Sequence, residues 1–407
     1  MEFQQLLFSL LVIYVSVRLF GELAIRLGQS AVLGDLLAGV LVGGSALNWV
    51  QPTQPLKLMG EIGVMLLLFE VGLKSDISSF LKAGRVAAMV ATIGVITPFV
   101  LGYGFARLLD MSQIQAIFVG ATLTATSVGF SARVLDDLGR LKTREGNIIL
   151  GAAVLDDILG LVILSVIMGL AESGTVSWLE VARTAVAAFL FLGLAILVGI
   201  RFVHWFTRLV NRMSSRGRLI MAAMIPVLLL GYLAELVHVA ALIGAFAAGL
   251  VLTRTEHHAP IEETIKPVAD IFVPIFFVLV GVATDLSLLN PFNPQNWPVL
   301  LMAGGLTVAA VLGKLAAGLG AGRGVNRWAV GVGMLPRGEV GLIFAGVGLS
   351  SAIISTAEYG AVLVVVTLTT VLSPLLLKWC FKAACTDGAA ASARSGSVRL
   401  GRSCGGS

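Results

Sequence analysis

Long apolar stretches recur along the whole chain, separated by short breaks that are rich in charged and turn-forming residues. A helix needs about 20 apolar residues to cross the hydrocarbon core of a bilayer, and most of the stretches have about that length. The pattern predicts thirteen transmembrane helices, at residues 4–25, 30–47, 56–73, 84–107, 113–138, 146–171, 178–200, 217–238, 240–253, 267–284, 298–321, 328–352 and 359–379. We therefore expect an all-α polytopic membrane protein.

The composition indicates that lipid surrounds most of the chain. Hydrophobic residues make up 57% of the 407 residues and charged residues only 13%, and the mean hydropathy is +0.96. A soluble domain carries about 25% charged residues because its surface faces water. This excludes an ordinary soluble enzyme. The 47 glycines suit helices that approach one another backbone to backbone.

Basic residues gather on one side of the predicted membrane. If the N-terminus is outside, 21 of the 28 lysines and arginines fall in cytoplasmic loops, the adjoining span ends and the C-terminal tail, while the loops and span ends of the opposite side hold only Lys57 and Arg107. Such an asymmetry is typical of cytoplasmic loops. We expect a cytoplasmic C-terminus and a location in the inner (plasma) membrane of the cell. The net charge of +5 is explained by these loops, so we expect no nucleic-acid partner.

The last part of the chain differs from the rest. Residues 383–407 are rich in Ala, Ser, Gly and Arg and offer nothing from which to build a core, which predicts a disordered cytoplasmic tail. The transmembrane domain is then residues 1–382. The three cysteines, Cys380, Cys385 and Cys404, support neither a disulfide framework nor a metal site.

Two adjacent carboxylates, Asp156 and Asp157, lie in the middle of the span 146–171. Ionisable groups inside a membrane are costly and usually functional. Neighbouring residues of a helix point about 100° apart, so we expect one aspartate to take a basic partner and the other to face a cavity. The alternative is a buried pair of protonated or salt-bridged acids without a transport role.

Lys314 is the only lysine away from the ends of a predicted span and is the natural partner of one aspartate. Burial and a neighbouring carboxylate act on a lysine in opposite directions, so such a pair can bind or release a proton according to what else occupies the site. The alternative is a lysine that extends to the membrane interface.

Two spans contain sequences that interrupt helices. The span 113–138 holds a cluster of hydroxyl and glycine residues that includes Thr126 and Ser127, and the span 328–352 holds Pro336-Arg337-Gly338-Glu339. Proline removes a backbone hydrogen bond and flanking glycines weaken the turn. In the predicted topology the two spans lie at matching places of inverted repeats, which is where transporters bind their substrates. Hydroxyls and glycines that serve only tight packing are the alternative for the span 113–138.

One further carboxylate is a weaker candidate. Glu70 lies near the end of the span 56–73. It is expected either to line an ion path or to be an ordinary interfacial carboxylate.

Several long motifs together resemble a known family, the bacterial sodium/proton antiporters of the second monovalent cation:proton antiporter family, in its electrogenic Asp-Asp branch. The resemblance extends over nearly all of residues 5–380. The motifs are residues 33–43, 67–73, 125–129, 149–157 and 336–342.

This resemblance implies a homodimer of thirteen-helix subunits, with two interrupted helices crossing inside each. Core helices (84–171 and 298–379) would move against scaffold helices (4–73 and 217–284), with 178–200 as a linker. Sodium would bind beside Asp157, with Thr126 and Ser127 nearby, and would compete there with protons. Asp156 would pair with Lys314 and release it when the cation binds.

Charged residues of the second interruption complete this hypothesis. Arg337 and Glu339 would neutralise or position the ends of the interrupted helices. The expected activity is export of sodium in exchange for protons by alternating access, serving pH homeostasis. Only the transported ions would bind, without a resident cofactor.

Alternatives come from the same family and from other classes. A potassium/proton antiporter is one, although the potassium-efflux branch usually has Gln-Asp in place of Asp156-Asp157. That branch also carries a cytosolic nucleotide-binding domain, for which this chain ends too soon. A sodium-coupled symporter of organic anions and a membrane sensor without transport are the others. An enzyme is not expected, because the buried residues include no persuasive nucleophile and base.

Overall fold

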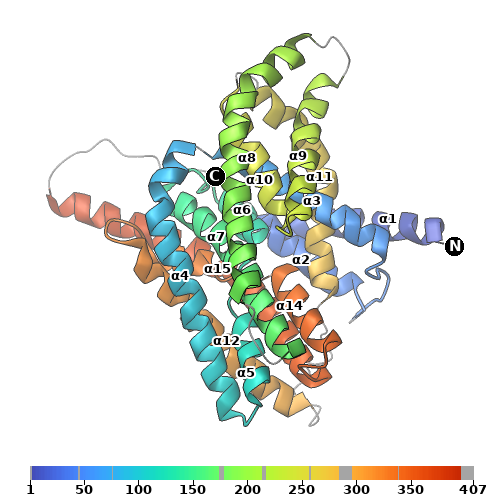
Figure 1. Ribbon diagram of the computed structural model, residues 1–407, viewed down its shortest axis with the longest axis vertical. Helices are drawn as coiled ribbons and strands as arrows, with labels where there is room; N and C mark the ends of the chain where they lie inside the picture. The colour runs from blue at the N-terminus through green and yellow to red at the C-terminus, as the bar shows by residue number, and fades with distance from the viewer. Residues whose placement is uncertain are drawn as a thin grey trace.

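A computed structural model describes residues 2–44, 46–75, 77–173, 178–212, 217–255, 258–283, 296–337 and 339–395 of the chain. These residues form α-helices and no strand (Figure 1). The helices of the first half are α1 (Glu2–Arg26), α2 (Ala31–Val42), α3 (Gln54–Lys74), α4 (Ile77–Leu108), α5 (Gln113–Thr122), α6 (Val128–Asp137), α7 (Arg144–Ser173) and α8 (Trp178–Arg212). Those of the second half are α9 (Arg218–Leu236), α10 (Ala241–Leu252), α11 (His258–Val282), α12 (Trp297–Ala317), α13 (Arg327–Gly333), α14 (Glu339–Ser350) and α15 (Thr356–Ser395). A short 3-10 helix, η3 (Gly318–Ala321), continues α12.

Each of the thirteen expected stretches contains a helix, and the two with interrupting sequences are divided. The expected span 113–138 forms α5 and α6, and the expected span 328–352 forms α13 and α14. Within the described part of the chain, eight helices are long and apolar enough to cross a membrane, and α2 and α10 are shorter apolar helices. The discontinuous helices are thus confirmed, whereas thirteen crossings remain a prediction.

The chain is built as two structural repeats. The helices α2 and α10 begin 210 residues apart, at Ala31 and Ala241, and they end 210 residues apart, at Val42 and Leu252. The two interruptions keep nearly the same spacing, since α5 and α13 end at Thr122 and Gly333. Helix α8 lies between the repeats in the sequence.

The helices pack in two groups. One contains α1, α2 and α3 with α9, α10 and α11, and the other contains α4 to α7 with α12 to α15 (Figure 1). Helix α8 contacts α7, α9 and α10 and therefore touches both groups. The groups meet mainly where α6 lies against α2 and α3. The resemblance names the segments of the first group scaffold and those of the second core, and we keep these names for the two groups. Their roles stay a prediction.

Glycines let the scaffold helices touch backbone to backbone. Where α3 crosses α10, a Cβ atom added to Gly72 would lie 2.5 Å from a carbonyl oxygen of α10, and one added to Gly249 would lie 2.2 Å from a carbonyl oxygen of α3. The same arrangement recurs at Gly39 and Gly281, where α2 crosses α11. Helices in lipid associate through such close packing because burial of apolar surface gives them little. The scaffold group is consequently tight at two symmetry-related crossings.

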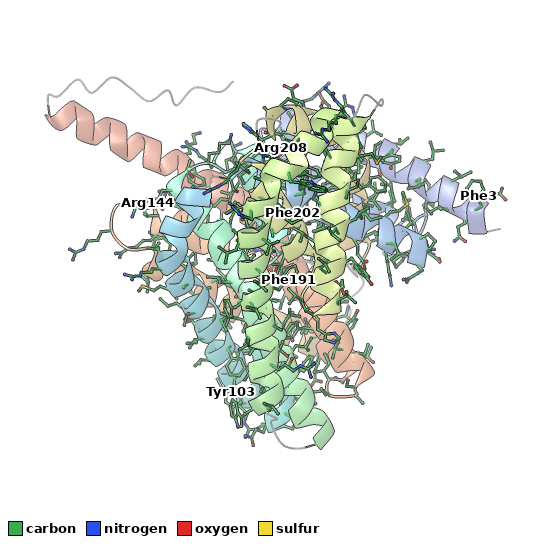
Figure 2. All side chains as sticks on the ribbon, turned by 45° about the horizontal axis from the view of Figure 1, so that its top comes forward. Phe3, Tyr103, Arg144, Phe191, Phe202 and Arg208 are labelled. Carbon is green, nitrogen blue, oxygen red and sulfur yellow. The ribbon has the colours of Figure 1, made fainter. Side chains whose placement is uncertain are left out.

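The ends of the molecule carry different residues. In Figure 2, Arg144 at the start of α7 and Arg208 near the end of α8 lie toward the top of the view, whereas Tyr103 near the end of α4 lies toward the bottom. Phe191 and Phe202 follow one another along α8 between these ends. The orientation of the two ends relative to the cytoplasm stays a prediction.

The C-terminal segment differs from the sequence prediction. Disorder was expected from residue 383, whereas α15 continues as a helix to Ser395 and projects from the body of the molecule (Figure 1). Alanines recur in this segment, and alanine is the best helix former. The rest of the predicted tail, residues 396–407, lies outside the described residues.

Candidate ion-translocation site

The interruption between α13 and α14 follows from its sequence. Pro336 has no backbone N–H and cannot continue the helical hydrogen-bond pattern, and the residue before a proline disfavours helical geometry. Accordingly α13 ends at Gly333, and the next helix begins at Glu339.

The interruption between α5 and α6 has a different local origin. Ser127 adopts an extended backbone, and its side-chain oxygen accepts a hydrogen bond from the backbone N–H of Phe130 at 3.4 Å. Serine is a favoured residue at this position before the first turn of a helix. Ser127 thus starts α6 as a new helix after α5 has ended at Thr122.

The two interruptions cross and satisfy each other's backbone groups. The backbone N–H of Ser127 donates to the carbonyl oxygen of Pro336 at 2.8 Å. The hydroxyl of Thr126 donates to the carbonyl oxygen of Met334 at 3.2 Å, and Ser131 donates to that of Gly333 at 2.7 Å. Backbone groups buried within a membrane need such partners because they cannot form hydrogen bonds to water instead. Residues about 200 positions apart in the sequence therefore form one structural unit.

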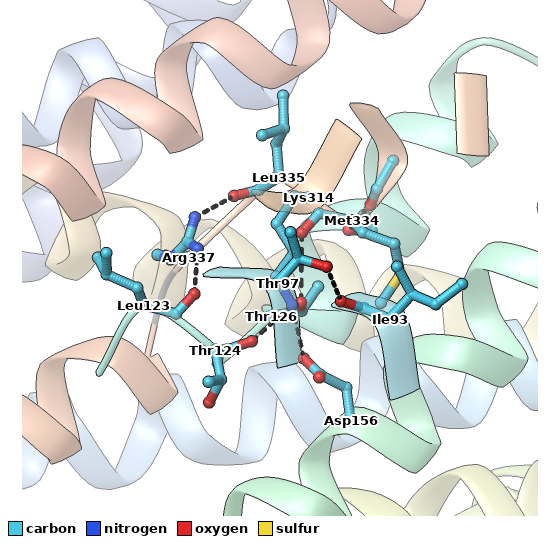
Figure 3. Close-up of polar contacts among 12 residues, drawn as sticks. Ile93, Thr97, Leu123, Thr124, Thr126, Asp156, Lys314, Met334, Leu335 and Arg337 are labelled. Atoms are coloured by element: carbon cyan, nitrogen blue, oxygen red, sulfur yellow. Dashed lines mark hydrogen bonds and ion pairs between the residues drawn. The ribbon is translucent and has the colours of Figure 1, made fainter. Parts of the chain in front are cut away.

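A buried ion pair lies beside this crossing. The Nζ atom of Lys314, on α12, is 3.2 Å from Oδ2 of Asp156, on α7, and both side chains are fully buried. Lys314 also donates to the carbonyl oxygen of Thr124 at 2.5 Å, so it joins the aspartate to the end of α5 (Figure 3). The pairing of Asp156 with Lys314 that the resemblance implied is present.

Arg337 brings a second buried cation to the same helix end. Its guanidinium donates to the carbonyl oxygens of Leu123 and of Leu335, the latter at 3.2 Å (Figure 3). Carbonyl groups at the end of a helix carry partial negative charge, and here Lys314 and Arg337 both lie against the end of α5. Arg337 belongs to the interruption between α13 and α14, and its side chain bonds to the end of α5 at the other interruption. It therefore links the two interruptions.

The two aspartates have different surroundings. Asp156 is 1% exposed and makes the ion pair with Lys314, whereas its neighbour Asp157 is 7% exposed. Their side chains diverge because successive residues of a helix are rotated by about 100°. The sequence left open which aspartate takes the basic partner, and the structure gives this place to Asp156.

Two candidates remain, of which Glu70 lies apart from this cluster. Glu70 is buried in α3, where its Oε1 has no hydrogen-bond partner among the described residues. It lies one helical turn before Lys74, which forms an ion pair of 2.7 Å with Asp136 of α6. Glu339 begins α14, but its side chain lies outside the described residues.

One residue at the crossing escaped the sequence analysis. Thr370 of α15 is fully buried and bonds to the backbone of Arg337. The sequence carries a signal for it, since Thr367, Thr369 and Thr370 follow one another in an otherwise apolar span. A threonine cluster is common in membrane helices, however, because its hydroxyls bond to their own helix.

Comparisons with known proteins agree with this architecture. The family described as "Sodium/hydrogen exchanger, transmembrane" matches residues 9–383. The High-affinity Na(+)/H(+) antiporter NhaS3 of Synechocystis sp. is 40% identical, over 93% of this chain and 90% of that protein. The Na(+)/H(+)-K(+) antiporter GerN of Bacillus cereus is 37% identical, over 94% of this chain and 98% of that protein.

A solved structure has the same fold. The sodium proton antiporter MjNhaP1 from Methanocaldococcus jannaschii gives a TM-score of 0.66 at 20% identity, covering 93% of this chain and 97% of that chain. At this identity the likeness concerns the fold. The family match, by contrast, extends over nearly the whole helical body of the protein. The chain is a multi-pass membrane protein and belongs to the sodium/hydrogen exchanger family.

Proposed function

We propose that the protein is a secondary active antiporter that exports sodium in exchange for protons. The observation that carries this proposal is a carboxylate pair and a lysine, Asp156, Asp157 and Lys314, buried at the crossing of two interrupted helices. The names of the relatives at 40% and 37% identity support sodium as a substrate. Ionisable groups at this depth are expensive and are retained for function.

Competition for Asp157 couples the two flows. A carboxylate binds either a partly dehydrated sodium ion or a proton, and it cannot hold both with full affinity. Oxygen atoms of Thr126 and Ser127, in the adjacent interruption, would complete the sodium coordination. Glu70 would line the route between this site and water, and Glu339 would help to balance the charge at the start of α14.

The ion pair supplies a second proton. When sodium binds, Asp156 would turn from Lys314 toward the cation, and Lys314 would lose its proton. Two protons would then be exchanged for each sodium ion. The cycle would be electrogenic, so that a membrane potential that is negative inside helps to expel sodium.

Alternating access would come from movement of the core group, α4 to α7 with α12 to α15, against the scaffold group. The crossing lies inside the core group, so the bound ion would travel with it in an elevator-type motion. The scaffold would form the interface of a homodimer in the plasma membrane, as the resemblance implies, with the N-terminus outside and the C-terminus in the cytoplasm.

Proton movement in proteoliposomes tests this function. With an acidic lumen and a pH-sensitive dye inside, addition of sodium outside should raise the lumenal pH as protons leave. Vesicles without protein and vesicles with Asp157→Asn serve as controls. A lumenal pH that does not respond to sodium at any pH tested would contradict the proposal.

Potassium is the second candidate substrate, and a specific observation supports testing it. The relative at 37% identity is named a Na(+)/H(+)-K(+) antiporter. Potassium chloride in place of sodium chloride in the same vesicles distinguishes the two: a response to potassium alone would assign the protein to potassium/proton exchange.

A further inference from the structure

Hydroxyl side chains of α15 face the interruption between α13 and α14. Thr370 and Ser373 are buried and lie three residues apart, on one side of the helix. The Ser373 hydroxyl donates to the carbonyl oxygen of Val332, near the end of α13, at 3.2 Å. Thr370 bonds to the next part of the same segment, at Arg337. This side of α15 is therefore polar where the interrupted helix passes.

The Thr370 hydroxyl bonds to both backbone groups of Arg337, its N–H and its carbonyl oxygen. Its hydroxyl oxygen accepts a hydrogen bond from the backbone N–H of Arg337 at 3.2 Å. Its single proton lies within reach of two carbonyl oxygens, that of Arg337 and that of Val366, the latter at 2.7 Å. One side chain thus contacts the donor and the acceptor of the same residue.

The interruption makes this contact necessary. In a continuous helix the N–H of Arg337 would donate to the carbonyl oxygen of Gly333. That oxygen instead accepts from Ser131, and the helix has already ended there. An unpaired buried N–H costs about as much as a lost hydrogen bond, so Thr370 supplies the partner that the interrupted helix lacks.

We propose that Thr370 is a positioning residue for cation exchange, acting through Arg337. The contact fixes the backbone from which the Arg337 guanidinium reaches the Leu123 carbonyl at the end of α5. Lys314 binds the next carbonyl, that of Thr124, so a displaced Arg337 disturbs the surroundings of the ion pair. This inference rests on the proposed function.

A neighbouring threonine provides a matched control. Thr369 is as fully buried as Thr370, but among the described residues its hydroxyl donates only within α15, to Val365 at 2.8 Å and Val366 at 3.1 Å. Valine has nearly the shape of threonine without the hydroxyl. Thr369→Val and Thr370→Val therefore remove the same atom from adjacent, equally buried positions, and only the second removes a contact with the interruption.

The test compares these variants in proteoliposomes over a series of sodium concentrations and pH values. We expect Thr370→Val to raise the half-saturating sodium concentration on the order of fivefold, the size expected for a lost buried hydrogen bond, and to move the pH profile. Thr370→Ser, which keeps the hydroxyl, should stay within about twofold of the unchanged protein, as should Thr369→Val.

The outcomes separate this inference from the proposed function. Equal half-saturation and pH profile for Thr370→Val and Thr369→Val would overturn the positioning role while sodium/proton exchange stands. An unchanged protein that exchanges no ions would overturn both. If Thr370→Val does not accumulate in the membrane, Thr370→Ala against Thr370→Ser repeats the comparison, and equal values there overturn the role as well.

Discussion

Two lysine–aspartate ion pairs of this protein have similar chemistry and different surroundings. Lys314 and Asp156 lie 3.2 Å apart inside the core group, with no exposed side-chain surface. Lys74 and Asp136 lie 2.7 Å apart where the scaffold helix α3 meets the core helix α6, and their side chains are 15% and 33% exposed. The first pair is within one group of helices, and the second joins the two groups.

The difference concerns what each pair can do. Taking two charges out of water is costly, and a fully buried pair repays that cost only partly, so it is weak evidence for stability. Its presence at the crossing of the interrupted helices favours a chemical role. A pair that still touches solvent contributes little to stability, but it can open and close. The Lys74–Asp136 pair lies where the two groups would slide past each other in the proposed alternating-access movement.

The largest effect is expected beside the buried pair. In the proposed mechanism Asp157→Asn removes the charge for which sodium and protons would compete, so exchange should be abolished, which dye measurements in proteoliposomes would detect. The variant keeps the size of the side chain and should still accumulate in the membrane. Full exchange in this variant would remove Asp157 from the mechanism.

Breaking the buried pair is expected to be the next largest effect. Asp156→Asn leaves the charge of Lys314 without its partner, and removal of one member of a buried pair typically costs about 3–5 kcal/mol. Thermal unfolding in detergent should show the loss, and the pH profile of exchange should move.

The double variant Asp156→Asn with Lys314→Met is the control for that experiment. It removes both charges, so most of the stability should return while the pH profile stays altered. An unchanged pH profile in both variants would contradict the role of the pair in proton exchange.

The pair between the groups should matter less for stability and more for rate. Lys74→Ala should lower the free energy of unfolding by about 0.5–1 kcal/mol, as for partly exposed pairs. The exchange rate should change, because one contact between α3 and α6 is lost. The charge-reversed double variant, Lys74→Asp with Asp136→Lys, should recover only part of the rate, because the new carboxylate also faces Glu262, which lies 3.9 Å from Lys74. If both single and double variants exchange at the original rate, the pair has no part in the movement.

The smallest effect is expected for an ion pair within a single helix. Arg26 and Glu22 lie 3.1 Å apart within α1, and their side chains are 75% and 49% exposed. Arg26→Ala should change stability by less than about 0.5 kcal/mol and leave the exchange rate unaltered. A change in rate comparable to that of Lys74→Ala would indicate that surface charge in general, rather than the contact between the groups, sets the rate.

Much of the fold could be predicted because membrane helices are encoded locally. A helix in lipid satisfies its own backbone, and its length follows from bilayer thickness. The apolar stretches therefore mark the helices. Pro336 and the hydroxyl cluster around Thr126 mark the interruptions for the same reason, since each disturbs hydrogen bonds between near neighbours. The prediction was wrong at the end of α15. Low sequence complexity suggested disorder there, but the alanines of the same segment have a high helix propensity, and the segment is helical as far as Ser395.

The partners at the site could not be predicted from residues alone. Asp156 and Lys314 are 158 residues apart, and the side chain of Arg337 reaches Leu123, 214 residues away. Either aspartate was an acceptable partner for Lys314 in the sequence. Thr370 was overlooked because a threonine hydroxyl can bond to its own helix, as that of Thr369 does, or to another.

The amino-acid sequence alone is enough to locate the apolar helices, their interruptions and the few charged groups within them, because these properties depend on residues close together in the chain. Three arrangements become visible only in the folded protein: the two interruptions complete each other's hydrogen bonds, Asp156 rather than Asp157 pairs with Lys314, and Arg337 joins the two interruptions. Those arrangements depend on how helices from two distant repeats pack, and a hydrogen bond or an ion pair forms only within a few ångströms.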